Sequence, residues 1–156
     1  MTASQLAEWF DAHAAALTLF ARQHCDDPEA VVQDAFCKFA QQRTLPDEPV
    51  AWLYRVVRNG AIDAGRAERR RAKREAIVAK PVRWFAENAV DGLEAIEAVA
   101  ALESLPQEQR EVIVARLWGG MNLEQIAATV GCSASTVYRR YETGIATLRE
   151  RLEGRS

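Results

Sequence analysis

The region from residue 122 to residue 141 carries apolar residues at helical spacing on both sides of a single glycine. Before the glycine, the apolar side chains recur every three or four residues, at Leu123, Ile126, Ala127 and Val130. Gly131 can take the positive φ that a tight turn between helices often needs, and Ser133 stands where a second helix would need an N-cap. This pattern predicts a helix-turn-helix.

The second helix of this motif separates an apolar stripe from a polar face. We expect the stripe to be buried at Val137, Tyr141, Ile145, Leu148 and Leu152. We then expect the side chains of the outer face to be exposed to solvent, namely Ser135, Tyr138, Arg139 and Glu142. A helix with such a face can reach base edges and phosphates in a major groove. From these residues alone, the solvated face of an ordinary helical hairpin is the alternative.

Charge is unevenly distributed along the chain. The 156 residues carry a formal net charge of -2, which does not suggest a nucleic-acid binder. Residues 51–74, however, contain eight arginines or lysines against two acids, whereas the first fifty residues contain eight acids against three bases. This distribution predicts one face for phosphates and another surface for a basic protein partner.

The sequence lacks the residue patterns that several classes of function require. The three cysteines, Cys25, Cys37 and Cys132, have no metal-finger spacing, and the two histidines do not complete a metal site. We therefore expect no metal, no cofactor and, without a glycine-rich phosphate loop or a histidine-carboxylate pair, no enzyme. No apolar run approaches membrane-spanning length, and the N-terminus lacks the basic start of a signal peptide, so we expect a soluble cytoplasmic protein without a membrane partner.

The rest of the chain also has helical periodicity, and the expected fold class is all-α with two small domains. We expect helices over residues 4–24, 28–42, 93–104 and 107–118, and a further helix that runs from residue 50 into the arginine-rich region. A region of mixed charge around Pro81 predicts a linker at residues 76–92. Its aromatic pair, Trp84 and Phe85, is a candidate for docking on another surface.

Two aromatic residues precede the arginine-rich region. Trp52 and Tyr54 lie one to two helical turns before Arg58, Asn59 and Asp63. This combination is typical of sites where exposed bases stack on rings while arginines follow the backbone. For Trp52, a place in the core is an equal alternative.

Three stretches of the chain together resemble the extracytoplasmic-function (group IV) sigma factors of bacterial RNA polymerase. They are DPEAVVQDAFCKFAQQ, AWLYRVVRNGAIDAGRAERRRAKRE and LESLPQEQREVIVARLWGGMNLEQIAATVGCSASTVYRRYETGIATLRERL. Each stretch alone is a weak motif, and their order and spacing over nearly the whole chain carry the resemblance.

The resemblance implies two helical domains: sigma region 2 over residues 1–75 and sigma region 4 over residues 93–156. Such proteins bind core RNA polymerase and direct it to promoter DNA without an active site of their own. In the family, region 2 docks on the clamp helices of the largest polymerase subunits, and the corresponding residues here are Glu29, Gln33, Asp34 and Phe36. An anti-sigma factor is a further candidate partner.

The resemblance also implies two DNA-binding surfaces. Region 2 of the family melts the minus-ten element, which suggests residues 43–49 as a specificity loop and, for the melting surface, Trp52, Arg55, Arg58, Asn59, Asp63, Arg66, Arg69 and Arg70. Region 4 reads the minus-thirty-five element as duplex. Its matching contact positions are Tyr138, Arg139, Glu142 and Thr143, with Ser135, Thr136 and Arg140 on phosphates or in a supporting role.

The chain departs from the family pattern at two places. Ala30 stands where the family usually has an acid, and many members carry a small residue and an arginine where this chain has Arg139 and Thr143. The promoter sequence therefore cannot be borrowed from relatives. The main rival interpretation is a stand-alone helix-turn-helix regulator, whose N-terminal half would dimerise or bind a ligand.

Overall fold

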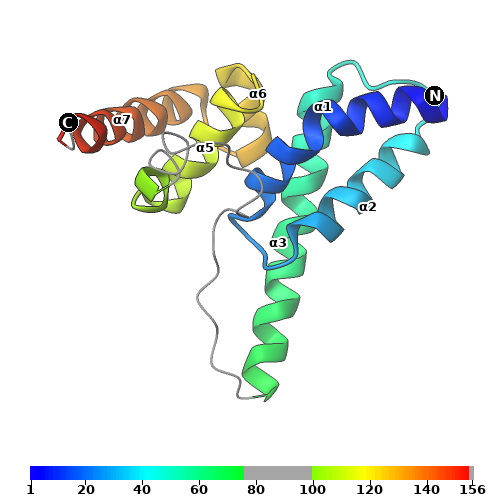
Figure 1. Ribbon diagram of the computed structural model, residues 1–156, viewed down its shortest axis with the longest axis horizontal. Coiled ribbons are helices and arrows are strands. Elements are labelled where there is room, and N and C mark those ends of the chain that lie inside the picture. Colours follow the sequence, from blue (N-terminus) through cyan, green and yellow to red (C-terminus); the bar gives the residue numbers. More distant parts are fainter. Residues whose placement is uncertain (76–99, 155–156) are drawn as a thin grey trace. The chain divides into compact units, whose positions relative to one another are not determined.

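A computed structural model of the chain describes residues 1–75 and 100–154, and every regular element in these two ranges is a helix (Figure 1). The chain divides into two compact units, Met1–Arg83 and Trp84–Ser156. The predicted all-α fold class is thus confirmed. The predicted linker, with Trp84 and Phe85, lies outside the described residues.

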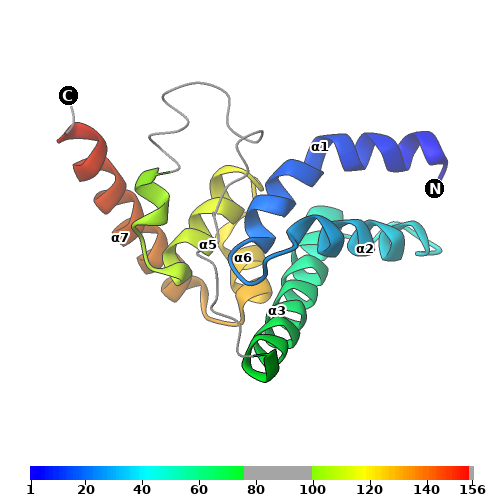
Figure 2. The ribbon, with the colours of Figure 1, turned by 60° about the horizontal axis from the view of Figure 1, so that its bottom comes forward.

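The first unit is built from three helices, α1 (Ala3–Ala21), α2 (Pro28–Ala40) and α3 (Pro49–Glu75), each of which packs on the other two. Local sequence fixes the start of α2, because the Asp27 side chain accepts a hydrogen bond from the Ala30 amide at 3.3 Å and Pro28 occupies the first turn. Helix α1 ends at Ala21, three residues before the expected end. Figure 2 shows α3 crossing the α1–α2 pair and continuing beyond it.

Aromatic rings fill much of the core of the first unit. Phe20, Phe39 and Tyr54 have no exposed surface, and the rings of Phe20 and Tyr54 meet edge to face with centroids 4.9 Å apart. Burial of a side chain of this size contributes about 1.5–3 kcal/mol. This core covers only the first two thirds of α3, because Gly65 is the last buried residue of the helix.

The second unit contains α5 (Gln107–Leu117), α6 (Leu123–Val130) and α7 (Ala134–Glu153), and residues 100–103 are also helical. Gly131 ends α6 in the left-handed region at φ 78°, and the Ser133 hydroxyl accepts a hydrogen bond from the Thr136 amide at 3.2 Å. Asn122 and Gln125 add a reciprocal capping box at the start of α6. The predicted helix-turn-helix is confirmed.

The apolar stripe of α7 is shorter than the sequence predicts. Val137 is fully buried, Ile145 and Leu148 are half-buried, and Leu152 is 41% exposed. The expectation of a buried Leu152 is therefore wrong, because the last turn of α7 borders an open pocket. Gly144 is instead buried where α7 crosses α5, and a Cβ there would stand 2.6 Å from the Ile113 Cδ1 atom.

Gly65 makes a testable contribution to the first unit. A Cβ at this position would overlap the carbonyl oxygen of His24, which belongs to the backbone of the turn after α1 and cannot rotate away. We expect Gly65→Ala to lower the free energy of unfolding by about 1–3 kcal/mol, the usual cost of overpacking. Urea unfolding of the full chain measures this loss.

Gly60→Ala is the matched control, since it lies in the same helix and its Cβ would meet only a side-chain atom, Val31 Cγ1, at 3.2 Å. It should cost clearly less than Gly65→Ala. Equal losses at the two positions would contradict the backbone contact.

Candidate nucleic-acid interface

Polar and charged residues form one stripe along α3, on the side opposite its buried face. The stripe runs at intervals of three or four residues through Trp52, Arg55, Asn59, Asp63, Arg66, Arg70 and Lys73. With 1.5 Å of rise per residue it is about 30 Å long. Arg58 and Arg69 lie outside the stripe, because each stands four residues after a buried residue of α3, Tyr54 and Gly65 respectively, and Arg58 is half-buried. The α3 helix therefore places six of the eight residues that the sequence predicted for the melting surface on one stripe, and the expectation that Arg58 and Arg69 share it is wrong.

The two ends of this stripe differ in chemistry. At the N-terminal end, the half-buried Trp52 leans on Phe39, with ring centroids 5.7 Å apart, and part of its surface is open to solvent. At the C-terminal end, Arg66, Arg69, Arg70 and Lys73 line a shallow, open depression. The Asp63 carboxylate lies 4.0 Å from the Arg66 guanidinium, and both side chains are largely exposed. Such a pair contributes little to stability, so Arg66 can exchange it for a phosphate.

Tyr54 does not belong to this surface, and the expectation that it offers a stacking ring is wrong. Its side chain is fully buried against Phe20 on the opposite side of α3 from Asn59 and Asp63. Its hydroxyl has no hydrogen-bond partner among the described residues, and burial raises the pKa of this phenol.

Helix α2 contributes a second polar surface. Glu29, Gln33 and Asp34 are exposed, and Asp34 forms an ion pair with Lys38 at 3.2 Å. Phe36, predicted with them as a contact residue, is 4% exposed. Its ring lies 5.1 Å from that of Phe10, so Phe36 supports the surface from beneath, which corrects its predicted role.

The outer face of α7 collects the residues predicted to read duplex DNA. Ser135, Tyr138, Arg139, Glu142 and Thr143 are all exposed, and Tyr138 keeps 53% of its surface in solvent. Their spacing of three, four, seven and eight residues from Ser135 places them on one side of the helix. The Arg139 guanidinium donates a hydrogen bond to the Thr136 hydroxyl at 3.3 Å, which orients it from within the same helix.

Two of the predicted residues have structural partners inside the second unit. The Thr136 hydroxyl lies 2.9 Å from that of Ser133, in the cap of α7. The Arg140 guanidinium lies 3.8 Å from the Glu108 carboxylate on α5 and donates to the Cys132 sulfur at 3.8 Å. Of the two roles left open for Arg140, a supporting one fits these contacts.

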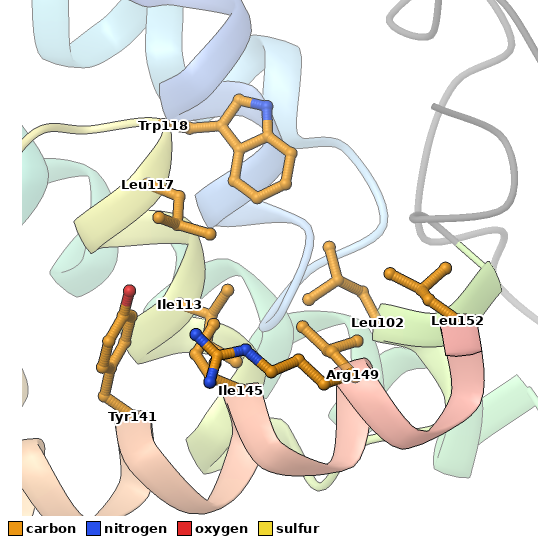
Figure 3. Close-up of a pocket in the computed structure, with 9 residues that line it drawn as sticks. Leu102, Ile113, Leu117, Trp118, Tyr141, Ile145, Arg149 and Leu152 are labelled. Carbon is orange, nitrogen blue, oxygen red and sulfur yellow. The ribbon is translucent and has the colours of Figure 1, made fainter. Parts of the chain in front are cut away.

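Two cavities lie beside the polar surfaces. One, of about 360 Å³, lies where residues 42–45 meet the N-terminal turns of α1, and Trp9 and Arg43 line it. The other, of about 340 Å³, is an apolar pocket of the second unit (Figure 3). Its open edge is formed by Leu117, 55% exposed, and Trp118, 46% exposed, with Arg149 on α7 supplying its charge.

The described part of the chain has no group of histidine, cysteine, aspartate or glutamate side chains arranged to hold a metal ion. None of its helices is both long enough and apolar enough to span a membrane.

Comparison with known proteins connects these surfaces to one family. Residues 101–150, which contain the capped helix-turn-helix, match the family model "Sigma-70, region 4". The ECF RNA polymerase sigma factor SigE of Mycolicibacterium smegmatis is 32% identical over 145 residues, or 88% of this chain and 55% of that protein. The chain belongs to the extracytoplasmic-function sigma factors.

Other similarities agree with this membership. The RNA polymerase sigma-E factor of Streptomyces avermitilis is 44% identical over 54 residues, which cover 35% of this chain and 30% of that protein. CnrH, solved in complex with the cytosolic domain of CnrY, is 28% identical, with a TM-score of 0.61, over 99% of this chain and 92% of that one. The sigma factor RpoE of Bartonella quintana, solved with the anti-sigma factor NepR, shares the fold, with a TM-score of 0.69 at 23% identity over 91% of each chain.

The chain spans between about a third and three fifths of the length of the curated relatives that it matches.

Sequence reasoning did not predict three residues that organise the surfaces. Glu68 contacts the turn between α1 and α2. Arg110, a residue of α5, is only 9% exposed, and burial lowers the pKa of its guanidinium to about 10. Gly144 allows α7 to approach α5. Gly144 was detectable as a glycine within a helical pattern, whereas the partner of Glu68 lies 42 residues away in sequence, too far to be inferred.

The buried position of Tyr54 predicts an unusual response to substitution. Tyr54→Phe removes a hydroxyl that lacks a hydrogen-bond partner among the described residues and keeps the ring against Phe20, so we expect the free energy of unfolding to stay equal or to rise by about 1 kcal/mol. Chemical denaturation measures it. Tyr54→Ala, the control, should lose about 3–5 kcal/mol by opening a cavity. A loss above 1 kcal/mol in Tyr54→Phe would mean that the hydroxyl has a stabilising partner.

Proposed function

We propose that this chain binds core RNA polymerase and directs it to promoters, where it takes part in recognition and opening of the DNA during transcription initiation. The observation that carries the proposal is the pairing of two different polar surfaces in one member of this sigma family. One is the Trp52-to-Lys73 stripe of α3, and the other is the outer face of α7. Sigma factors are non-enzymatic regulators, and the proposal needs no chemical step.

The α7 face suits double-stranded DNA. A helix whose N-terminal turns carry an exposed tyrosine, arginine and carboxylate can enter a major groove, where arginine reads guanine and a carboxylate accepts from cytosine. We assign base contacts to Tyr138, Arg139, Glu142 and Thr143, and phosphate contacts to Ser135. Thr136 and Arg140 hold this face in place through the cap and the Glu108 ion pair.

The α3 stripe suits a strand that has left the duplex. Unpairing a base costs a few kcal/mol, and stacking on an aromatic ring can return about 1–3 kcal/mol for each base. The partly exposed Trp52 offers such a ring, and the basic end of the stripe offers charges for the phosphates. We infer that opening is driven by binding energy in the assembled complex. Residues 43–49 are the proposed specificity loop at the start of this surface.

We propose two protein partners, core RNA polymerase and an anti-sigma factor. The exposed Glu29, Gln33 and Asp34 give α2 an acidic, polar surface that suits the clamp helices of the largest polymerase subunits. An anti-sigma factor is a second proposed partner, because the similar RpoE was solved with one, and we propose that the protein acts in the cytoplasm. We also propose sigma region 2 for residues 1–75, the linker for 76–92 and sigma region 4 for 93–156.

Runoff transcription tests the proposal. Core polymerase plus this protein should yield specific transcripts from a promoter library of the cognate genome, and core polymerase alone should not. A protein that gives no transcript but shifts a palindromic duplex by itself would instead be a stand-alone helix-turn-helix regulator.

Arg139 provides a prediction at the level of one base pair. Arg139→Ala should cost about 1–3 kcal/mol of discrimination at a single position of the upstream element, because a bidentate base contact is lost. Binding to a panel of singly substituted duplexes measures this profile. Arg140→Ala is the matched control, and it should weaken binding to all sequences alike, since Arg140 is held by Glu108 and Cys132. A uniform loss for Arg139→Ala would make it a phosphate contact.

A further inference from the structure

The basic end of α3 has almost no core beneath it. Gly65 is the last buried residue of this 27-residue helix, and the turns after it carry Arg66, Arg69, Arg70, Arg71, Lys73 and Arg74. Like charges three or four residues apart destabilise a helix by about 0.2–0.5 kcal/mol per pair. Short helices in water depend on tertiary contacts for most of their stability. This end of α3 therefore needs an anchor if its charges are to stay in place.

One tertiary contact beyond Gly65 meets that need. The backbone amide of Asp26, in the turn between α1 and α2, donates to both carboxylate oxygens of Glu68, at 3.2 Å to Oε1 and 3.1 Å to Oε2. A hydrogen bond to an ionised acceptor is roughly twice as strong as one between neutral groups. The same turn meets α3 one helical turn earlier, where the His24 carbonyl lies against Gly65.

Helical geometry places this anchor behind the basic surface. Arg66, Arg70 and Lys73 follow one another at three- or four-residue spacing on the outer side of α3. Glu68 lies two residues from Arg66 and from Arg70, which puts it most of a half-turn away from them. Its carboxylate is thus used on the inner side of the helix, toward the turn, and leaves the basic side open.

The negative charge of Glu68 also acts on a residue of the α1–α2 turn, Cys25. After burial, Glu68 is the next largest cause that raises the pKa of the Cys25 thiol to about 11. The Cys25 side chain is buried next to Asp26. Glu68 therefore acts toward the α1–α2 turn, consistent with its hydrogen bonds.

We propose that Glu68 is a positioning residue, which ties the basic end of α3 to the α1–α2 turn and so holds Arg66, Arg70 and Lys73 in line with Trp52 for contact with promoter DNA. This inference rests on the proposed function. Phosphate contacts made by a preorganised helix avoid the entropy cost of ordering the helix during binding. Loss of the anchor should therefore weaken DNA opening without altering the duplex-reading face on α7.

Two substitutions separate the anchor from a simple charge effect. Glu68→Ala removes the acceptor, whereas Glu68→Gln keeps an acceptor oxygen but removes the negative charge. Glu75→Ala is the matched control, because it removes a carboxylate from the same helix end at an exposed position. Simple charge removal would strengthen DNA binding in all three variants.

Hydrogen exchange of the free, full-length chain is the first readout. In Glu68→Ala we expect the amides of residues 66–75 to exchange about five-fold faster than in the wild type, the factor for one lost hydrogen bond. In Glu68→Gln the exchange rates of the same amides should stay within about two-fold of the wild-type rates, because the amide oxygen still accepts a hydrogen bond. In Glu75→Ala the exchange rates should be unchanged. Unaltered exchange in Glu68→Ala, or an equal rise in Glu68→Gln and Glu68→Ala, would overturn the proposal.

Promoter opening with core polymerase, followed by a fluorescent base in the minus-ten element, is the second readout. Glu68→Ala should open DNA more slowly, Glu68→Gln should recover most of the rate, and affinity for upstream duplex should not change. Normal opening by Glu68→Ala would also overturn the positioning role. If the wild type itself gives no transcript or opening, the proposed function fails, and the exchange result still decides whether Glu68 orders the helix.

Discussion

The two opposite faces of α3 are the constraint on which the first unit depends. One face is buried with Phe20 and Phe39 through residues such as Leu53, Tyr54 and Val57, and the other carries the polar stripe from Trp52 to Lys73. Because burial stabilises only the part of the helix before Gly65, the remaining turns are held by the α1–α2 turn. The core and the proposed DNA surface are therefore two sides of the same element.

In the second unit, local capping fixes the position of the helix that carries the polar face. Gly131 and Ser133 fix the turn and the start of α7, while Gly144 lets α7 lie close to α5. The residues that we propose for base contacts occupy the opposite side of α7 from this contact. Arg140 lies between the two sides, and its ion pair with Glu108 links the outer face to α5. A rigid helix with a fixed start suits direct readout of base edges.

In our proposal, the two surfaces bind different parts of the same promoter, as expected for a member of the sigma family. The proposed duplex reader on α7 and the proposed single-strand reader on α3 differ in chemistry. The first relies on hydrogen-bonding groups at groove spacing, and the second on a ring and a row of cations. The acidic surface of α2 differs from both, which matches the charge separation between the first fifty residues and residues 51–74.

The sequence by itself determined the helices, their starts at Pro28 and Ser133, and the line of polar residues along α3, because these features depend on neighbours within one or two turns. It did not determine whether Tyr54 and Phe36 face solvent, where the stripe of α7 stops, or what Glu68 and Arg140 contact. The sequence pattern does not distinguish an aromatic side chain that is exposed to a binding partner from one that is buried in the core. Only the packing of α1 and α2 on α3, and of α5 on α7, decided these points, because the partners come from segments that lie far away in sequence.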